Sequence, residues 1–428
     1  MGAAPKWRLG LGLEMFAKTL VTKGSSLVLR SGQALGCLQD LLAQTGARTV
    51  YWTRLYDPEA VSRDQELKRS LKSTGIEARS FEGHVLFEPW DVVTKTGGFY
   101  RVYSPMWRSV KDRHVASPLA APVTIPAPYA WPSSDQLSDW SLGAEMHRGS
   151  AVVRPYLRLG EGAAQVRLAE FTAGAISEYL MMRDIPSYDA TSGLSENLAV
   201  GEISPRQCWH AGMQAHLDGA PGAEMFLKEL VWREFAYHLL YHTPHIAKRN
   251  WKPDWDHFAW NEDDNHPNVL AWIRGRTGIP FVDAGMRELY VTGRMHNRAR
   301  MIVASYLTKH LLSHWKIGLR LFQDCLVDWD PASNAMGWQW SAGSGPDATP
   351  FFRVFNPVSQ LDKFDPKRQY VDRWIAEDQI RPSATALSYF DAIPKSWALS
   401  ADMAYPNAII SPQEGRSRAL SAYKTRGF

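Results

Sequence analysis

The stretch of sequence that decides the fold covers residues 292–342, which begin TGRMHNRARMIVASYLTKHLLSHW (292–315) and end LVDWDPASNAMGWQWSA (326–342). Residues 295–315 contain neither Pro nor Gly, and their apolar residues recur at helical spacing, which predicts one continuous helix. Asn297, Arg300 and Met301 stand at positions i, i+3 and i+4, so one helix face carries all three. This amide, cation and thioether, with carboxylates and tryptophans close behind, predict a pocket for a large, flat, redox-active aromatic cofactor.

The second half of the stretch places polar and aromatic side chains close together. Asp328, Asp330 and Asn334 precede two tryptophans, Trp338 and Trp340. Each also has a simpler interpretation: the aspartates suit a solvated turn or a weak metal site, the asparagine suits a turn, and the tryptophans suit a core. Two carboxylates rarely hold a metal without further ligands, so we predict no metal site.

The composition is that of an ordinary globular protein. Of 428 residues, 45% are hydrophobic and 21% are charged, which suits two or three domains with a large core. No apolar run approaches the roughly 18 residues of a membrane span, and the N-terminus lacks the features of a signal peptide, so we expect a cytoplasmic protein with no membrane partner. Cys37, Cys208 and Cys325 are scattered, which predicts free thiols. The net charge of +4 allows nucleic-acid binding through a local patch.

The N-terminal part alternates strands and helices. We predict strands at 25–30, 47–54 and 76–83, and helices at 32–46 and 57–75. This βαβαβ order implies a parallel, Rossmann-like sheet. A Pro-rich segment follows, which predicts an extended, semi-rigid connection. Helical patterns then dominate, most clearly at 166–184, 223–242 and 279–293. We therefore divide the chain into an α/β domain (1–112), a linker (113–165) and an all-α domain (166–428).

Several long motifs make the chain recognisable. Besides the 292–342 stretch, they are DATSGLSENLAVGEISPRQCW (189–209), KELVWREFAYHLL (228–240), GRTGIPFVDAGMREL (275–289) and NAMGWQWSAGSGPDATPFFRVFNP (334–357). In this order they resemble the flavin-binding core of the photolyase/cryptochrome family, most closely the class I cyclobutane pyrimidine dimer photolyases. The resemblance implies an α/β N-terminal antenna domain followed by an all-α domain that binds FAD and DNA.

The same resemblance identifies one departure at the N-terminus. Family members open the α/β domain with a strand and a helix before the equivalent of GAAPKW (2–7), and this segment does not precede it here. We expect either a late-placed start or a shortened domain with an unpaired strand. Gly97, Gly98 and Phe99 replace an Asn-Glu pair that holds folate in some relatives, so we do not expect folate and leave the antenna chromophore open.

The resemblance assigns a set of flavin contacts. TSGLS (191–195) would bind the pyrophosphate of FAD through hydroxyls and backbone amides, although Thr191 or Ser192 alone would equally suit a helix cap. Asn334 would face the redox-active ring nitrogen, where a neutral amide suits a reduced, anionic flavin. The full set of expected cofactor contacts is Tyr179, Thr191, Ser192, Gly193, Leu194, Ser195, Asn297, Arg300, Asp328, Asp330 and Asn334.

Three tryptophans match the family's electron relay. An electron would pass from the surface to the flavin through Trp260, then Trp315 and finally Trp338, the innermost of the three. Apart from the resemblance, packing in the core is the simpler interpretation of all three.

The substrate side is a second group of residues. Glu229, Met301 and Asn334 are expected to act in catalysis, and Trp232 and Trp340 to flank a flipped-out dimer by stacking. The expected substrate and DNA contacts are Arg183, Glu229, Trp232, Asn297, Arg298, Met301, Trp340 and Arg353. Each arginine would also suit a surface ion pair.

The resemblance implies a monomeric, nucleoid-associated carbon–carbon lyase that repairs pyrimidine dimers in UV-damaged DNA with light and reduced FAD. The alternatives are a cryptochrome-like blue-light photosensor and a truncated, inactive product. A (6-4) photolyase is disfavoured because the chain lacks that branch's histidine pair.

Overall fold

The computed structural model describes residues 1–428. Its N-terminal lobe is built on two parallel strands, β1 (Thr49–Thr53) and β2 (Glu77–Phe81). Thr49 lies opposite Glu77, and the crossover helix α3 (Pro58–Ser73) connects the two strands. α3 begins where Asp57 accepts a hydrogen bond from the amide of Ala60 (2.9 Å). α2 (Ala34–Thr45) ends at Gly46 in the left-handed conformation. The predicted α/β class of this part is confirmed.

The predicted strand at 25–30 does not form. Instead, the backbone of this segment bonds to the Pro-rich connection: Leu29 donates to the Ser134 hydroxyl (2.9 Å), and Asp135 donates to the Leu29 carbonyl (2.8 Å). No strand lies beside the segment to form a ladder, so its extended sequence remains irregular.

The predicted linker is irregular only in its first half. Residues 111–136 contain no helix or strand. Short helical elements follow, namely 3₁₀ turns at Leu137–Trp140, Ala144–Met146 and Arg154–Tyr156, and α5 (Gly149–Val153). The division of the chain at 112 and 165 remains a prediction.

The remainder of the chain is helical and contains no strand. The helices are α1 (Ala3–Thr22), α4 (Tyr103–Val110), α6 (Gly160–Ala173), α7 (Tyr179–Met182), α8 (Ser195–Val200), α9 (Pro205–Leu217), α10 (Ala223–His242), α11 (Pro267–Ile273), α12 (Pro280–Thr292), α13 (Asn297–Ser305), α14 (Trp315–Cys325), α15 (Pro331–Ala342), α16 (Pro357–Phe364), α17 (Gln369–Trp374), α18 (Ala384–Ala392) and α19 (Pro412–Lys424). Further 3₁₀ turns lie at Pro244–Ala247, Pro253–His257 and Lys395–Trp397.

Two of the predicted helices are shorter than expected. The helix predicted at 166–184 ends at Ala173, because Gly174 interrupts it before the short α7. The helix predicted at 295–315 comprises α13 and a π-helical turn, Tyr306–His310, and it then breaks at Leu312, where φ is +51°. His314 caps the next helix by accepting from the amide of Lys316, so Trp315 begins α14.

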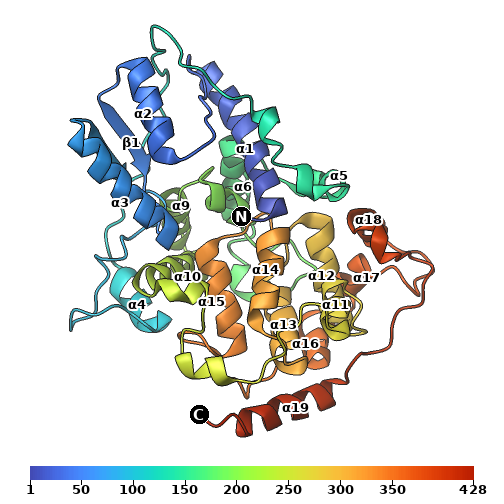
Figure 1. The fold of residues 1–428 in the computed structure, drawn as a ribbon. Helices are drawn as coiled ribbons and strands as arrows, with labels where there is room; N and C mark the ends of the chain where they lie inside the picture. The colour runs from blue at the N-terminus through green and yellow to red at the C-terminus, as the bar shows by residue number, and fades with distance from the viewer.

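Most of the core lies in the helical part. Two clusters, of 36 and 31 buried residues, surround α11–α15 and α9–α10 respectively. Although α1 precedes the sheet in sequence, it packs against α14 and α6 of the helical part (Figure 1). In Figure 1, α2, β1 and α3 form a separate lobe at the upper left. No helix is long and apolar enough to cross a membrane.

Candidate flavin and substrate site

Three segments that are distant in sequence meet at Asp328. The Arg300 guanidinium on α13 donates to both carboxylate oxygens of Asp328 (3.0 and 2.8 Å), and the Ser195 hydroxyl at the start of α8 donates to one of them (2.7 Å). Arg300 is also held by the Met295 carbonyl (2.8 Å). The structure therefore brings together three of the residues predicted to contact the flavin.

Asn334 lies on α15 with a defined orientation. Its amide nitrogen donates to the Leu319 carbonyl on α14 (3.1 Å). This bond occupies the donor end of the side chain and leaves the carbonyl oxygen as an acceptor. An acceptor without charge is what the predicted role beside a ring N–H requires.

The 191–195 turn depends on glycine and on an arginine behind it. Gly193 has φ of +62°, a conformation that a residue with a side chain rarely adopts. Arg167 on α6 donates to the carbonyls of Thr191 and Ser192 (2.7 Å each). No side chain caps α8, so the alternative that Thr191 or Ser192 is a helix cap is not supported.

Tyr179 and Asp330 both have defined contacts within the protein. The Tyr179 ring is buried against Phe171, with ring centroids 5.5 Å apart. Asp330 begins α15 by accepting from the Ser333 amide (2.7 Å), and it also accepts from the Tyr237 hydroxyl on α10. This carboxylate thereby ties α15 to α10.

On the predicted substrate side, α10 presents Glu229 and Trp232. Arg183 forms an ion pair with Oε1 of Glu229, and no hydrogen bond within the protein engages Oε2. The Trp232 ring is stacked on Tyr103 of α4, with centroids 3.8 Å apart and planes within 5°. One face of Trp232 is therefore covered by the protein itself.

The other predicted substrate residues differ in their exposure to solvent and in their contacts within the protein. Met301 and Trp340 are half-buried, on α13 and α15. Asn297 and Arg353 are exposed. Arg298 is committed, because it pairs with Asp184 (2.6 Å) and lies over the Phe364 ring (4.3 Å).

The three predicted relay tryptophans share one core cluster. Trp338 lies edge-on to Phe322 (4.9 Å between centroids), and Trp315 donates to the Asn250 side chain (2.8 Å). The His314 ring lies 5.1 Å from Trp260 and 5.4 Å from Trp315. Their convergence in one core is compatible with a relay, which remains a prediction.

Sequence reasoning missed several residues of the site. Tyr103 stacks on Trp232, Tyr237 binds Asp330, and Arg167 supports the 191–195 turn. Tyr237 belongs to the 228–240 motif that resembles the family, so motif membership was an available signal for it. Arg167 carried no signal, since its role depends on a contact across 24 residues.

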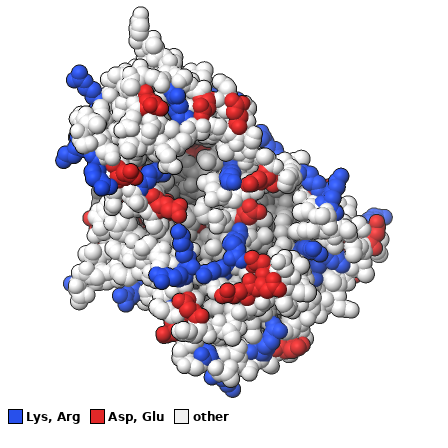
Figure 2. All heavy atoms as spheres, viewed as in Figure 1, with Lys and Arg blue, Asp and Glu red and all other residues white.

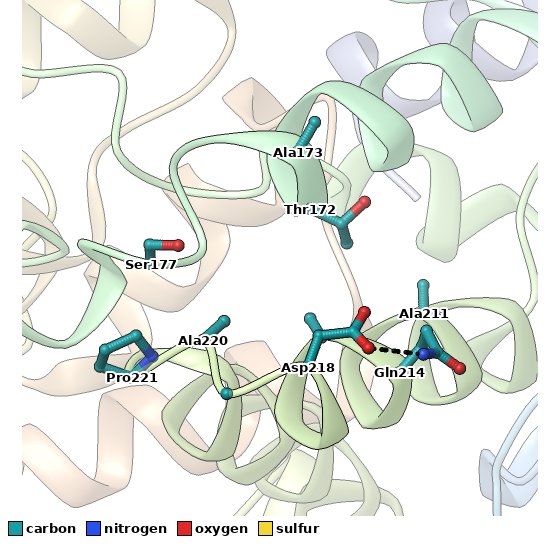
Figure 3. Close-up of a pocket in the computed structure, with 10 residues that line it drawn as sticks. Thr172, Ala173, Ser177, Ala211, Gln214, Asp218, Ala220 and Pro221 are labelled. Atoms are coloured by element: carbon teal, nitrogen blue, oxygen red, sulfur yellow. Dashed lines mark hydrogen bonds between the residues drawn. The ribbon is translucent and has the colours of Figure 1, made fainter.

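The surface features do not by themselves locate a site. On the face in Figure 2, basic and acidic side chains are interspersed over both parts of the molecule. The depression in Figure 3, of about 510 Å³, lies between α6 and α9, where Gln214 donates to Asp218 (2.9 Å). None of the predicted site residues lines it, so we assign it no function.

Comparisons with known proteins identify the family of the chain. Residues 226–425 match the family model described as the FAD binding domain of DNA photolyase, and residues 1–127 match the one described as DNA photolyase. A deoxyribodipyrimidine photo-lyase from Agrobacterium fabrum is 44% identical, over 99% of this chain and 89% of that protein. The Escherichia coli deoxyribodipyrimidine photo-lyase is 34% identical, over 95% of this chain and 85% of that protein.

Solved structures show the same relationship. A bacterial class III photolyase from Agrobacterium tumefaciens has a TM-score of 0.91 at 43% identity, covering 99% of this chain and 89% of that chain. A Synechocystis cryptochrome has a TM-score of 0.81 at 25% identity, covering 99% and 88%. The chain therefore belongs to the photolyase/cryptochrome family, and it is an enzyme of the photolyase type with FAD as its cofactor.

The residues present fit FAD. The glycine turn suits a phosphate, the Arg300–Asp328 pair offers a polar edge, and the Asn334 carbonyl offers an uncharged acceptor. The subclass expected from the motifs, class I, remains a prediction, while the Agrobacterium tumefaciens structure is named class III.

Proposed function

We propose that this enzyme repairs cyclobutane pyrimidine dimers in UV-damaged DNA by a light-driven reaction. The observation that carries the proposal is that expected substrate and flavin residues share α13 and α15, and that α10, which carries further expected substrate residues, packs against α15. Glu229 and Trp232 lie on α10, Arg300 and Met301 on α13, and Asn334 and Trp340 on α15. α15 contacts both of the others.

Glu229 and Trp232 would hold the flipped-out dimer. Oε2 of Glu229 is available to accept from a thymine N–H, while Arg183 keeps the carboxylate in place through Oε1. The face of Trp232 that Tyr103 does not cover would stack on one base. Trp340 would contact the second base, and the exposed Arg353 would contact a DNA phosphate.

Asn334 and the Arg300–Asp328 pair would hold the flavin ring. When bound, reduced FAD absorbs light and supplies one electron to the dimer, which returns it after two cyclobutane C–C bonds have broken. The Asn334 carbonyl would accept from the ring without adding a negative charge. Because the amide nitrogen of Asn334 donates to the Leu319 carbonyl, the side-chain carbonyl oxygen of Asn334 would be oriented before light absorption.

The second candidate is a cryptochrome-like photosensor. The observation that favours it is the TM-score of 0.81 to the Synechocystis cryptochrome, together with 31% identity to Arabidopsis cryptochrome-2. The substrate residues on α10 and α15 support the repair enzyme instead, since a photosensor does not need them.

Repair of an oligonucleotide with one thymine dimer tests the proposal. The protein is purified with its flavin, reduced chemically and incubated with the oligonucleotide in light and in darkness. We expect intact thymines to return in light only. Bound flavin without any repair would contradict the repair function and favour the photosensor.

Glu229→Ala sharpens this test. The variant removes one hydrogen bond between the charged Glu229 carboxylate and the substrate. Repair efficiency should therefore fall by roughly 10- to 100-fold at unchanged flavin content. The matched control is Glu224→Ala on the same helix, whose exposed carboxylate pairs only with Lys228 (3.0 Å). Equal repair by both variants would remove Glu229 from the mechanism.

A further inference from the structure

An unusual concentration of guanidinium groups surrounds the 191–195 turn and the start of α8. It consists of Arg8, Arg158, Arg167 and Arg294, from four separate parts of the chain. The carboxylates buried among them are Glu196, with 0% exposure, and Glu202, with a side chain 10% exposed. The four guanidinium groups of this cluster therefore outnumber the two carboxylates among them, although Arg158 and Arg294 are only half-buried.

Three of these arginines are committed to partners within the protein. Arg8 binds Glu202 and lies 3.6 Å from Glu196, and Arg294 also binds Glu196. Arg167 donates to two carbonyls of the turn and to Asp189 (2.7 Å). These contacts account for most of their donors.

Arg158 differs from the other three. Its side chain makes no hydrogen bond or ion pair, and its Nη1 is buried without a partner, while its backbone is well bonded to Glu196 (2.9 Å) and Asn197 (2.8 Å). Burial, followed by repulsion from Arg167 and Arg294, lowers the pKa of Arg158. The acidic groups that oppose this, Asp189 and Glu170, have side chains 69% and 60% exposed and are screened by water.

Nη1 of Arg158 lies close to the 191–195 turn. A Cβ added to Gly193 would lie 3.7 Å from Nη1 of Arg158 and 3.4 Å from Nε of Arg167. The two guanidiniums therefore face the side of the turn that glycine leaves free of a side chain. A guanidinium with a buried nitrogen that lacks a partner is costly unless an anion binds beside it.

We propose that Arg158 is a ligand of the FAD pyrophosphate. The pyrophosphate diester carries two negative charges, which would offset the excess of guanidinium groups over buried carboxylates in this cluster. Arg167 then acts as a positioning residue, since it shapes the turn through its carbonyls, whereas Arg158 supplies the free donor. This inference rests on the flavin site proposed above.

The test compares Arg158→Gln with Arg154→Gln, an exposed arginine four residues earlier in the sequence. Dissociation constants for FAD, ADP and riboflavin are measured on flavin-stripped protein by fluorescence titration, and the stripped protein is also melted. Arg158→Gln should weaken FAD and ADP binding by roughly 10- to 100-fold and leave riboflavin binding unchanged. The stripped variant should melt at the same temperature as wild type or higher, because repulsion is relieved.

The outcomes are distinguishable. FAD affinity equal to that of wild type would overturn the proposal. A lower melting temperature of the stripped variant, with FAD, ADP and riboflavin all weakened, would also overturn it, since that pattern indicates a structural role. If Arg158→Gln does not fold, Arg158→Lys must keep ADP binding within about tenfold of wild type, because it keeps the charge. No FAD binding by the wild-type chain would instead overturn the flavin site itself.

Discussion

The helical part and the α/β lobe of this enzyme are held together to very different degrees. The two large core clusters, of 36 and 31 buried residues, lie mostly among the helices, whereas neither β1 nor β2 contains a buried residue, and α2 has none. α1 belongs to the N-terminal region by sequence, yet it packs against α14. The difference indicates that a chain segment takes its stability from the core it joins and not from its neighbours in sequence.

The largest expected effect concerns the attachment of α1. Arg8→Met leaves Glu196 and Glu202 without one of their buried partners, so we expect a loss of about 3–5 kcal/mol in the free energy of unfolding. The control is Lys6→Met, which breaks an exposed pair with Glu145 and should cost less than about 1 kcal/mol. Chemical denaturation measures both, and equal losses would place α1 outside the helical core.

The contact between the lobe and the helical part should depend on pH. Glu234 on α10 accepts from the amides of Leu86 (2.6 Å) and Phe87 (3.2 Å), and burial raises its pKa from 4.5 to about 7. The folded state therefore keeps the Glu234 carboxyl protonated up to about pH 7, whereas the unfolded chain releases this proton near pH 4.5. Stability that is complete below pH 4.5 should thus fall by roughly 3 kcal/mol as the pH rises through 7.

Glu234→Gln isolates this effect, because glutamine accepts the same hydrogen bonds without titrating. Denaturation at pH 5 and pH 8 should show a smaller decrease for the variant than for wild type. Parallel decreases would mean that Glu234 does not control the pH dependence of this contact.

A pair of glycines gives the smallest expected effects, of opposite sign. A Cβ on Gly318 of α14 would lie 1.9 Å from the Trp338 ring, so Gly318→Ala should cost about 1–3 kcal/mol and displace an expected relay tryptophan. A Cβ on Gly36 of α2 meets no atom within 4 Å, so Gly36→Ala should stabilise by about 0.4–1 kcal/mol. Thermal unfolding and tryptophan fluorescence would check both, and stabilisation by Gly318→Ala would contradict the packing described.

Much of the fold could be predicted because local signals are strong where the core agrees with them. The predicted helix at 223–242 corresponds to α10, Ala223–His242, and Gly46 and Gly293 end helices in the left-handed conformation as expected. The strand at 25–30 and the single helix at 295–315 were wrong, since a strand needs a pairing partner and the break at Leu312 depends on tertiary contacts.

By itself, the sequence determined the α/β character of the N-terminal part, the helical character of the larger part and, through its motifs, the family, while the site residues that it suggested remain a prediction. Only the tertiary structure decided that Arg183 holds Glu229, that Tyr103 covers one face of Trp232 and that Arg158 faces the 191–195 turn without a partner. The physical reason is that helix periods and caps are set within a few residues, whereas these contacts join residues that only the folded core brings together.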